Sequence, residues 1–165
     1  MTDVTIEEVV AQYDAAKAQY DEARRQIADR GAEVLNLSFQ KLFVEHPQLK
    51  AVQFKAYAPY FNDGEPCIWG LHGVYTGVAS DDPITTTGKY GPTDECGDED
   101  DDSGIAWFDG WVRTDDETSI DYLADEVTKR VESMEETIRD CLGEQHMQVI
   151  VTPAGMVVED YGDHD

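Results

Sequence analysis

Apolar residues recur with a helical period from Thr5 to His46. Five positions seven residues apart are apolar or aromatic, and an apolar or small residue lies three positions after four of them. This spacing is the a/d seam of a coiled coil, sustained over about four to five heptads. Thr5 and Glu8 have the spacing of a capping box, which predicts the start of the helix, and Pro47 predicts its end near His46. The a row consists of Ile6, Tyr13, Tyr20, Ile27 and Val34, and the d row of Val9, Ala16, Ala23 and Leu37.

The predicted helix is too long for one small domain to cover. At 1.5 Å per residue, about 40 residues span about 60 Å. Arg30 and Gly31 weaken the seam locally. Either the helix breaks near Gly31, or its first half packs on another copy of the chain or on another helix. The second alternative predicts a homodimer whose seam is formed by Ile6, Tyr13, Tyr20 and Ile27.

Residues 51–78 alternate between apolar and other side chains, which predicts two strands. Between them, Asn62-Asp63-Gly64 supplies residues that tolerate positive φ, so we expect a β-hairpin with a tight turn. Residues 105–112 are predicted to form a further strand, with Trp107 and Trp111 as apolar anchors.

A second helix is predicted from an N-cap at Thr118 or Ser119 to Gly143, because apolar residues follow at alternating steps of three and four. After it, residues 152–155 have the form of a type I turn with a following bulge inside a second hairpin. We therefore predict one α+β domain over residues 1–165. Its antiparallel sheet contains two hairpins and an extra strand, and two helices pack on it. The long, coiled-coil-like helix occupies residues 1–46, and residues 80–104 form an acidic loop insertion.

Charge is the feature that departs most from an ordinary domain. The chain has 36 Asp and Glu against 12 Lys and Arg, a net charge of −24. Residues 80–165 carry 25 acids and 5 bases, so −20 of that charge lies in the second half. Nucleic acids and anionic membranes are themselves anions and are not expected to bind directly, whereas a basic protein surface is complementary. No apolar run approaches the roughly 18 residues of a membrane span, and we expect no membrane association.

The sequence predicts neither an enzyme nor a cofactor. It contains no Gly-rich phosphate loop, no GxSxG and no HExxH. A Cys67–His72 nucleophile pair is conceivable, but strand alternation separates the two faces unless Gly70 or Gly73 forms a bulge. The three cysteines have no metal-site spacing, and no signal peptide is recognised, so a reducing cytoplasm is expected.

An incomplete calcium-loop pattern occurs in the acidic loop. Asp98, Asp100 and Asp102 alternate and Asp109 follows at the twelfth position, but the glycine is displaced to Gly104 and the twelfth residue is not Glu. We favour a solvated acidic run, with no metal site.

Acidic residues recur at multiples of about four along the second predicted helix, opposite its apolar stripe. Such neighbours are about 5–6 Å apart, close to the spacing of phosphates along a nucleic-acid strand. The row could therefore imitate nucleic acid toward a basic partner; the alternative is a solvated face without specific use. The candidate partner-binding residues are Asp121, Asp125, Glu132, Glu136 and Asp140, extended by the loop residues Asp98, Glu99, Asp100, Asp101 and Asp102.

One motif resembles known proteins. The run Tyr57-x-Pro-Tyr-Phe-Asn-Asp-Gly-Glu-Pro-Cys67, preceded by Leu42-Phe43-x-x-His46-Pro47, resembles a group of small proteins encoded by bacteriophages and related mobile elements. The resemblance implies a phage-borne origin and carries over no activity. Small acidic phage proteins are often inhibitors of host nucleic-acid enzymes.

We therefore expect a non-enzymatic inhibitor in the cytoplasm of a host cell. It would dock on a basic host protein and compete with nucleic acid. The alternative is a structural or assembly protein that dimerises through the N-terminal helix.

Overall fold

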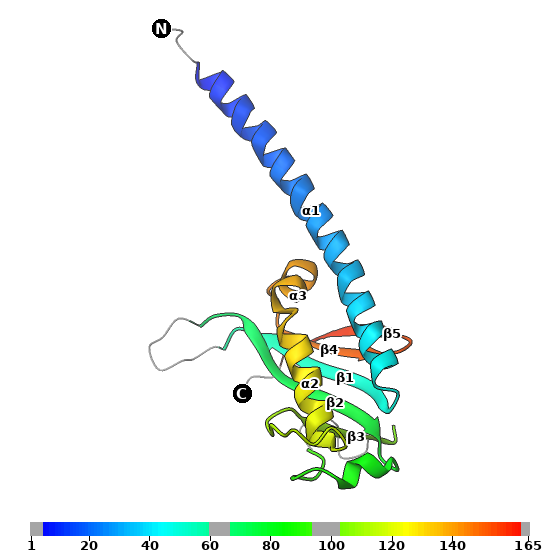
Figure 1. The fold of residues 1–165 in the computed structure, drawn as a ribbon. Coiled ribbons are helices and arrows are strands. Elements are labelled where there is room, and N and C mark those ends of the chain that lie inside the picture. The colour runs from blue at the N-terminus through cyan, green and yellow to red at the C-terminus, as the bar shows by residue number, and fades with distance from the viewer. Residues whose placement is uncertain (1–4, 60–66, 94–102, 163–165) are drawn as a thin grey trace.

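The described part of the chain combines three α-helices and a short 3-10 helix with one antiparallel sheet. A computed structural model describes residues 5–59, 67–93 and 103–162 (Figure 1). The sheet has five strands in the order β3-β2-β1-β4-β5, so the α+β class is confirmed, with one helix more than predicted. In chain order the elements are α1 (Ile6–Glu45), β1 (Leu49–Tyr57), β2 (Gly70–Ala79), the short 3-10 helix η1 (Pro83–Thr86), β3 (Ile105–Asp109), α2 (Ile120–Glu132), α3 (Glu135–Leu142), β4 (Met147–Thr152) and β5 (Gly155–Asp160).

The two hairpins lie side by side in the sheet. β1 pairs with β2, β4 pairs with β5, and β1 and β4 join the two hairpins. Thr152 lies opposite Gly155, and the β4–β5 register runs without a shift. The second hairpin is therefore confirmed, but the bulge predicted after its turn is wrong. The predicted turn at Asn62-Asp63-Gly64 lies outside the described residues.

A β-bulge interrupts β2 at Gly73. Phe54 of β1 lies opposite Val74, but the next residue, Lys55, lies opposite His72, so Gly73 has no partner. Its φ is +59°, and a Cβ there would meet the Tyr75 ring at 2.8 Å. Glycine is therefore required by both backbone conformation and space.

The main core lies between the sheet and the helices. α1, α2 and α3 contribute to one continuous cluster with the helix-facing residues of β1, β2 and β4 (Figure 1). The rings of Phe39 on α1 and Phe54 on β1 stack with centroids 6.3 Å apart. The opposite sheet face carries a smaller cluster of Ala51, Tyr75 and Trp107. We call the sheet, α2, α3 and residues 35–45 of α1 the head.

α1 is one continuous helix that projects from the head (Figure 1). The capping box is present: Glu8 N–H donates to Thr5 Oγ1 at 3.3 Å and Thr5 N–H donates to Glu8 Oε2 at 2.9 Å. The helix ends at Glu45, where the His46 N–H donates to the Leu42 carbonyl oxygen at 3.0 Å. We call residues 6–27 the outer part of α1.

The helix continues through Gly31 without a break. This glycine is a packing site. A Cβ at Gly31 would lie 2.4 Å from Cys141 Sγ on α3 and 3.3 Å from Thr137 Cγ2. Cys141 Sγ donates to the Ala28 carbonyl oxygen at 3.4 Å. The missing side chain therefore lets α3 approach α1 closely.

The predicted second helix is in fact two helices, α2 and α3. The Ser119 cap is confirmed, because the Tyr122 N–H donates to Ser119 Oγ at 3.2 Å. At the break, Ser133 Oγ donates to the Arg130 carbonyl oxygen at 2.7 Å, and Met134 N–H bonds only three residues back, to Val131. Such side-chain bonds compete with the helical ladder. The apolar stripe nevertheless continues into α3.

Candidate functional site

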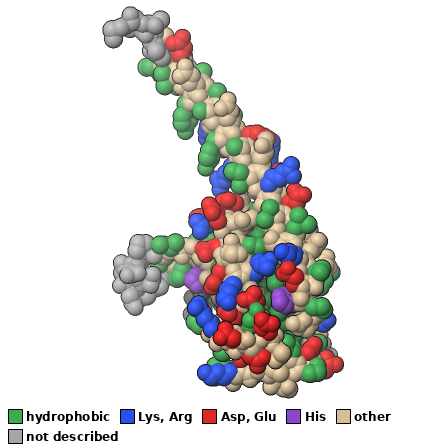
Figure 2. All heavy atoms as spheres, in the orientation of Figure 1, with side chains coloured by type: hydrophobic (Ala, Val, Ile, Leu, Met, Phe, Trp, Pro, Cys, Tyr) green, Lys and Arg blue, Asp and Glu red, His purple; other side chains and the backbone are tan. Residues whose placement is uncertain are grey.

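The predicted dimer seam lies on the surface of the outer part of α1. Tyr13 is 66% exposed and Tyr20 is 65% exposed. Ile6 and Ile27 are exposed as well. Figure 2 shows hydrophobic side chains along the projecting helix, with charged side chains beside them. Among the described residues, no other helix of the chain covers these four side chains.

The seam and the head occupy different faces of α1. Leu35 and Phe39 are buried in the head, whereas the seam residues Val34 and Leu37 are 50% and 57% exposed. The face that packs on the sheet is therefore not the face that carries the heptad pattern, and the head leaves the seam accessible.

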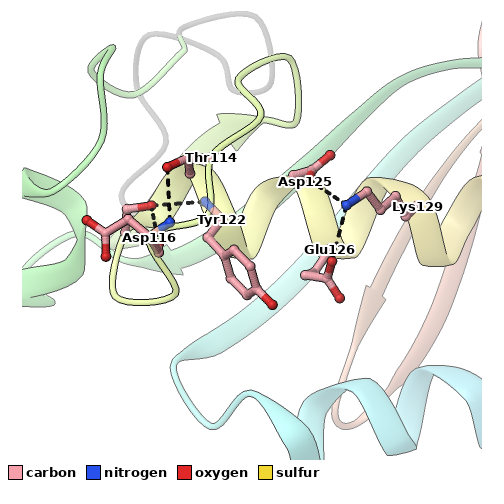
Figure 3. Close-up of polar contacts among 7 residues, drawn as sticks. Thr114, Asp116, Tyr122, Asp125, Glu126 and Lys129 are labelled. Carbon is pink, nitrogen blue, oxygen red and sulfur yellow. Dashed lines mark hydrogen bonds and ion pairs between the residues drawn. The ribbon is translucent and has the colours of Figure 1, made fainter.

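Asp125, one of the predicted partner-binding acids, is buried. It is 6% exposed, and its carboxylate lies 2.7 Å from Lys129 Nζ, which also approaches Glu126 at 3.4 Å (Figure 3). The hydrogen bond with Asp125 is the main cause that raises the pKa of Lys129 above its ordinary value. Asp125 therefore belongs to an ion pair inside the head and not to an exposed acidic row.

The other helix acids do not share one helix. Asp121 accepts the Lys89 N–H at 2.6 Å and so connects the loop after η1 to α2. Glu132 is exposed at the end of α2, whereas Glu136 and Asp140 are exposed on α3, beyond the break. The predicted single rigid row is therefore not formed. Residues 98–102 lie outside the described part of the chain.

A second group of acidic residues precedes α2 and was not among the residues predicted from the sequence. Asp115, Asp116 and Glu117 are exposed just before the Ser119 cap. Hydrogen bonds from the Thr118 hydroxyl, at 2.6 Å, and from the Thr118 N–H, at 3.0 Å, lower the pKa of Asp116. Three acids directly before a predicted N-cap were the available signal, because the positive end of a helix favours anions there.

A groove of about 390 Å³ opens between β2 and α2. β3 pairs only with Tyr75–Ala79 of β2, so the stretch before Tyr75 borders the groove. Trp107 is buried as predicted, but Trp111 lies beyond the end of β3 and is 84% exposed at this groove, so its predicted anchoring role is wrong. The lining residues are Leu71, His72, Gly73, Val74, Gly110, Trp111, Arg113, Asp125, Thr128, Lys129 and Glu132.

The groove contains no hydrogen-bonded nucleophile and base within the described residues. Thr128 Oγ1 and His72 Nε2 are both buried without a hydrogen-bond partner. The His72 ring instead stacks on Tyr57 with centroids 4.1 Å apart. Although the Gly73 bulge exists, Cys67 precedes β2 and is exposed. The groove thus offers paired charges and an exposed tryptophan, which are features of a binding surface.

No metal-ligand cluster of three or more His, Cys, Asp or Glu side chains occurs in the parts of the chain that the structure describes. Within the same ranges, no helix is both long enough and apolar enough to cross a bilayer. No family model, curated protein or solved structure matches the chain.

Proposed function

We propose that this protein is a non-enzymatic assembly protein that dimerises through the outer part of α1 and presents two acidic heads. The observation that carries the proposal is the exposed heptad seam, in which Ile6, Tyr13, Tyr20 and Ile27 share one face of a projecting helix. A helix face that stays in solvent does not require apolar residues, because polar residues serve equally well there.

The physical argument is the free energy of apolar burial. Moving a large apolar side chain from water into an interface stabilises the complex by about 1.5–3 kcal/mol. A helix without tertiary contacts is also only marginally stable in water. Pairing with a second helix would bury the seam and stabilise the helical conformation of the outer part together.

Light scattering of the full chain tests the proposal. We expect a dimer, and we expect Tyr13→Glu/Tyr20→Glu to be a monomer, because two charges would enter the interface. The matched control is Ala11→Glu/Ala15→Glu, which adds the same charge at exposed positions of the same helix outside the a and d rows. A monomeric wild-type chain, or equal effects of the two double variants, would contradict dimerisation through the seam.

A second candidate function is the inhibition of a host nucleic-acid-binding or defence protein, as in phage-type acidic inhibitors. What favours it is the −20 charge of residues 80–165, together with the exposure of Glu132, Glu136 and Asp140. Such a charge would steer the head toward a basic surface and make association fast and dependent on salt. A dimer would present two such heads, so the two functions are compatible.

Capture from host lysate at low salt tests this candidate. We expect a basic nucleic-acid-binding protein to be retained and then released by added DNA. The variant Glu132→Gln/Glu136→Gln/Asp140→Asn should retain less of it than the control Asp14→Asn/Asp21→Asn/Asp29→Asn, which removes the same charge from α1. The candidate fails if no basic protein is retained, or if DNA does not release it.

A further inference from the structure

Large and small residues alternate along the outer part of α1. The a row carries Tyr13 and Tyr20, whereas the d row carries Ala16 and Ala23. A shallow hollow beside the seam borders Ala23; its other lining residues are Ala18, Gln19, Glu22 and Gln26. The seam itself thus offers projecting rings on one row and small side chains that leave room for a ring on the other.

This alternation discriminates between the two orientations of a helix pair. In a parallel pair, a packs against a and d against d. Tyrosine would then face tyrosine and alanine would face alanine, which leaves overfilled and underfilled layers. In an antiparallel pair, a packs against d, so each tyrosine would face an alanine. Even filling of the layers is what close packing requires.

We propose that two copies pair through the outer part of α1 as an antiparallel coiled coil with its twofold axis at residue 18. This inference rests on the dimerisation proposed above and specifies its geometry. In this register Tyr13 packs on Ala23 of the second copy and Tyr20 packs on Ala16. Val9 packs on Ile27, and the outermost layers pair Ile6 with the aliphatic part of Arg30.

Shifting the register by one heptad in either direction keeps only one of the two tyrosine–alanine pairings. A longer overlap would place Tyr13 against Arg30, whose guanidinium forms an ion pair with Glu33 at 2.9 Å. A shorter overlap would end at Ala23 and leave Ile27 exposed. The register centred on residue 18 covers residues 6–30, about 37 Å of helix. It therefore uses the whole outer part of α1 and extends less than one turn beyond Ala28, where α3 contacts α1.

Residues beside the seam are compatible with this pairing. The g row consists of Gln12, Gln19 and Gln26, so the side chains facing one another across an antiparallel pair are uncharged on that side. On the other side Lys17 faces its own symmetry mate. Both lysines are exposed, and salt screens their repulsion.

The buried area is sufficient for a stable dimer. Each tyrosine is about two-thirds exposed, so pairing removes up to about 150 Å² from solvent at each, and the four tyrosines contribute up to about 600 Å². The isoleucines, valines and alanines of both seams raise the total beyond the roughly 1,000 Å² expected of a biological interface. The stripe thus has the size as well as the shape of an interface with a second copy.

The antiparallel arrangement determines what the dimer can do. The two heads lie at opposite ends of the paired helices, with their Ala28 attachment points about 30 Å apart along the axis. A parallel dimer would instead place both acidic heads at the same end, where their charges repel. The antiparallel dimer is a bivalent connector that can engage two separate partner sites.

Disulfide trapping tests the orientation. In a background of Cys67→Ser, Cys96→Ser and Cys141→Ala, we would prepare Val9→Cys and Ile27→Cys as separate proteins. In the proposed dimer a cysteine at position 9 lies about 27 Å from its own symmetry mate, beyond the reach of a disulfide, whose Cα atoms are less than about 7 Å apart. Neither protein should crosslink alone, whereas the mixture should form the heterodimeric disulfide. A parallel dimer gives the reverse result.

A size swap provides a second readout that needs no cysteine. Tyr13→Ala and Ala23→Tyr should each weaken the dimer about tenfold or more, because each spoils the same two mixed layers. The double variant Tyr13→Ala/Ala23→Tyr exchanges the two sizes across those layers and should restore the wild-type dissociation constant to within about threefold. In a parallel dimer the double variant gains no such recovery.

Light scattering of the same samples separates the two proposals. A monomeric background protein would overturn dimerisation itself and this inference with it. A dimer whose single-cysteine variants crosslink alone, or whose mixture does not crosslink, would overturn the antiparallel register and leave dimerisation standing. Heterodimeric crosslinking together with recovery in the double variant would support the register.

Discussion

At the scale of single residues, one lysine compensates the buried carboxylate of α2. Asp125 is enclosed by the head, and Lys129 approaches it from the solvent side with a side chain that is itself 56% exposed. Replacing Lys129 by Met would keep the aliphatic part of the contact and leave the buried carboxylate without its cation. Breaking such a pair from one side is destabilising because the remaining charge is uncompensated.

The pKa of Lys129 gives this contact a signature in alkaline solution. The pKa of Lys129 is raised in the folded state. The ion pair with Asp125 therefore contributes fully to stability below the ordinary lysine pKa of about 10.4, and this contribution is lost as pH rises through the higher folded value. We expect wild-type melting temperature to exceed that of Lys129→Met by several degrees at neutral pH. The difference should shrink as pH rises above the ordinary value.

Lys41→Met is the matched control for this measurement. Lys41 pairs with Glu45 at 3.5 Å one helical turn away, and both side chains are more exposed than Asp125. Exposed pairs contribute little to stability, so the control should stay close to wild type at every pH. A Lys129→Met difference that is constant from neutral to alkaline pH would refute the ion-pair argument.

At the scale of elements, the contact between α1 and α3 depends on the absence of a side chain at Gly31. In an ordinary helix interior, Gly→Ala stabilises a protein by about 1 kcal/mol. Here the new Cβ would collide with Cys141 Sγ, and overpacking costs about 1–3 kcal/mol. We expect Gly31→Ala to lower the free energy of unfolding, measured by denaturant titration.

A double-mutant cycle isolates the collision. Gly31→Ala should be harmless or stabilising in a Cys141→Ala background, because the sulfur is then absent, so the two changes should be coupled by about 1 kcal/mol or more. Ala32→Gly, at the exposed neighbouring position, reports helix propensity alone. If Gly31→Ala destabilised both backgrounds equally, close packing of α3 would not be the reason for the glycine.

The periodicity of apolar residues predicted most of the helices and strands. It did not predict the break between α2 and α3 or the packing of α3 on α1. The seven-residue repeat, the Thr5 and Ser119 caps and the alternation in residues 51–78 are local patterns, and the corresponding elements are present. The break at Ser133 was not predicted, because Val131, Met134 and Ile138 keep the apolar spacing across it. The packing role of Gly31 could not be predicted from local sequence either, because it depends on α3, more than a hundred residues away.

The candidate site was less predictable than the fold. Asp125 and Glu132 follow one acidic pattern in the sequence, yet one is buried and the other exposed. Trp107 and Trp111 look equivalent until the end of β3 separates them. In each pair the difference arises from tertiary packing, which encloses Asp125 in the head and buries Trp107 in the cluster with Ala51 and Tyr75. The heptad pattern of the seam could be found in the sequence because it is a property of one helix, whereas its exposure depends on where the head packs on α1.

At the scale of the whole molecule, repulsion between acidic side chains destabilises the folded head. Residues 80–165 carry −20, and those of them that the structure describes carry 16 acids and 5 bases, −11, in or beside the sheet. Mutual repulsion of this kind destabilises a folded state and is relieved by screening. The outer part of α1 carries far less charge and projects away, so the heads and not the paired helices should determine how stability depends on salt.

Salt should therefore stabilise the head. Between about 0.01 M and about 1 M sodium chloride the Debye length falls from about 30 Å to about 3 Å. We expect the melting temperature of the head, measured by near-UV circular dichroism, to rise by several degrees over this range.

Charge removal from the head should have a similar effect. The variant Asp115→Asn/Glu117→Gln/Glu144→Gln removes three exposed head charges and should raise the low-salt melting temperature and flatten the salt dependence. The control Asp14→Asn/Asp21→Asn/Asp29→Asn removes the same charge from α1 and should change both much less. Equal effects of the two triple variants would mean that net charge, and not its concentration on the head, limits stability.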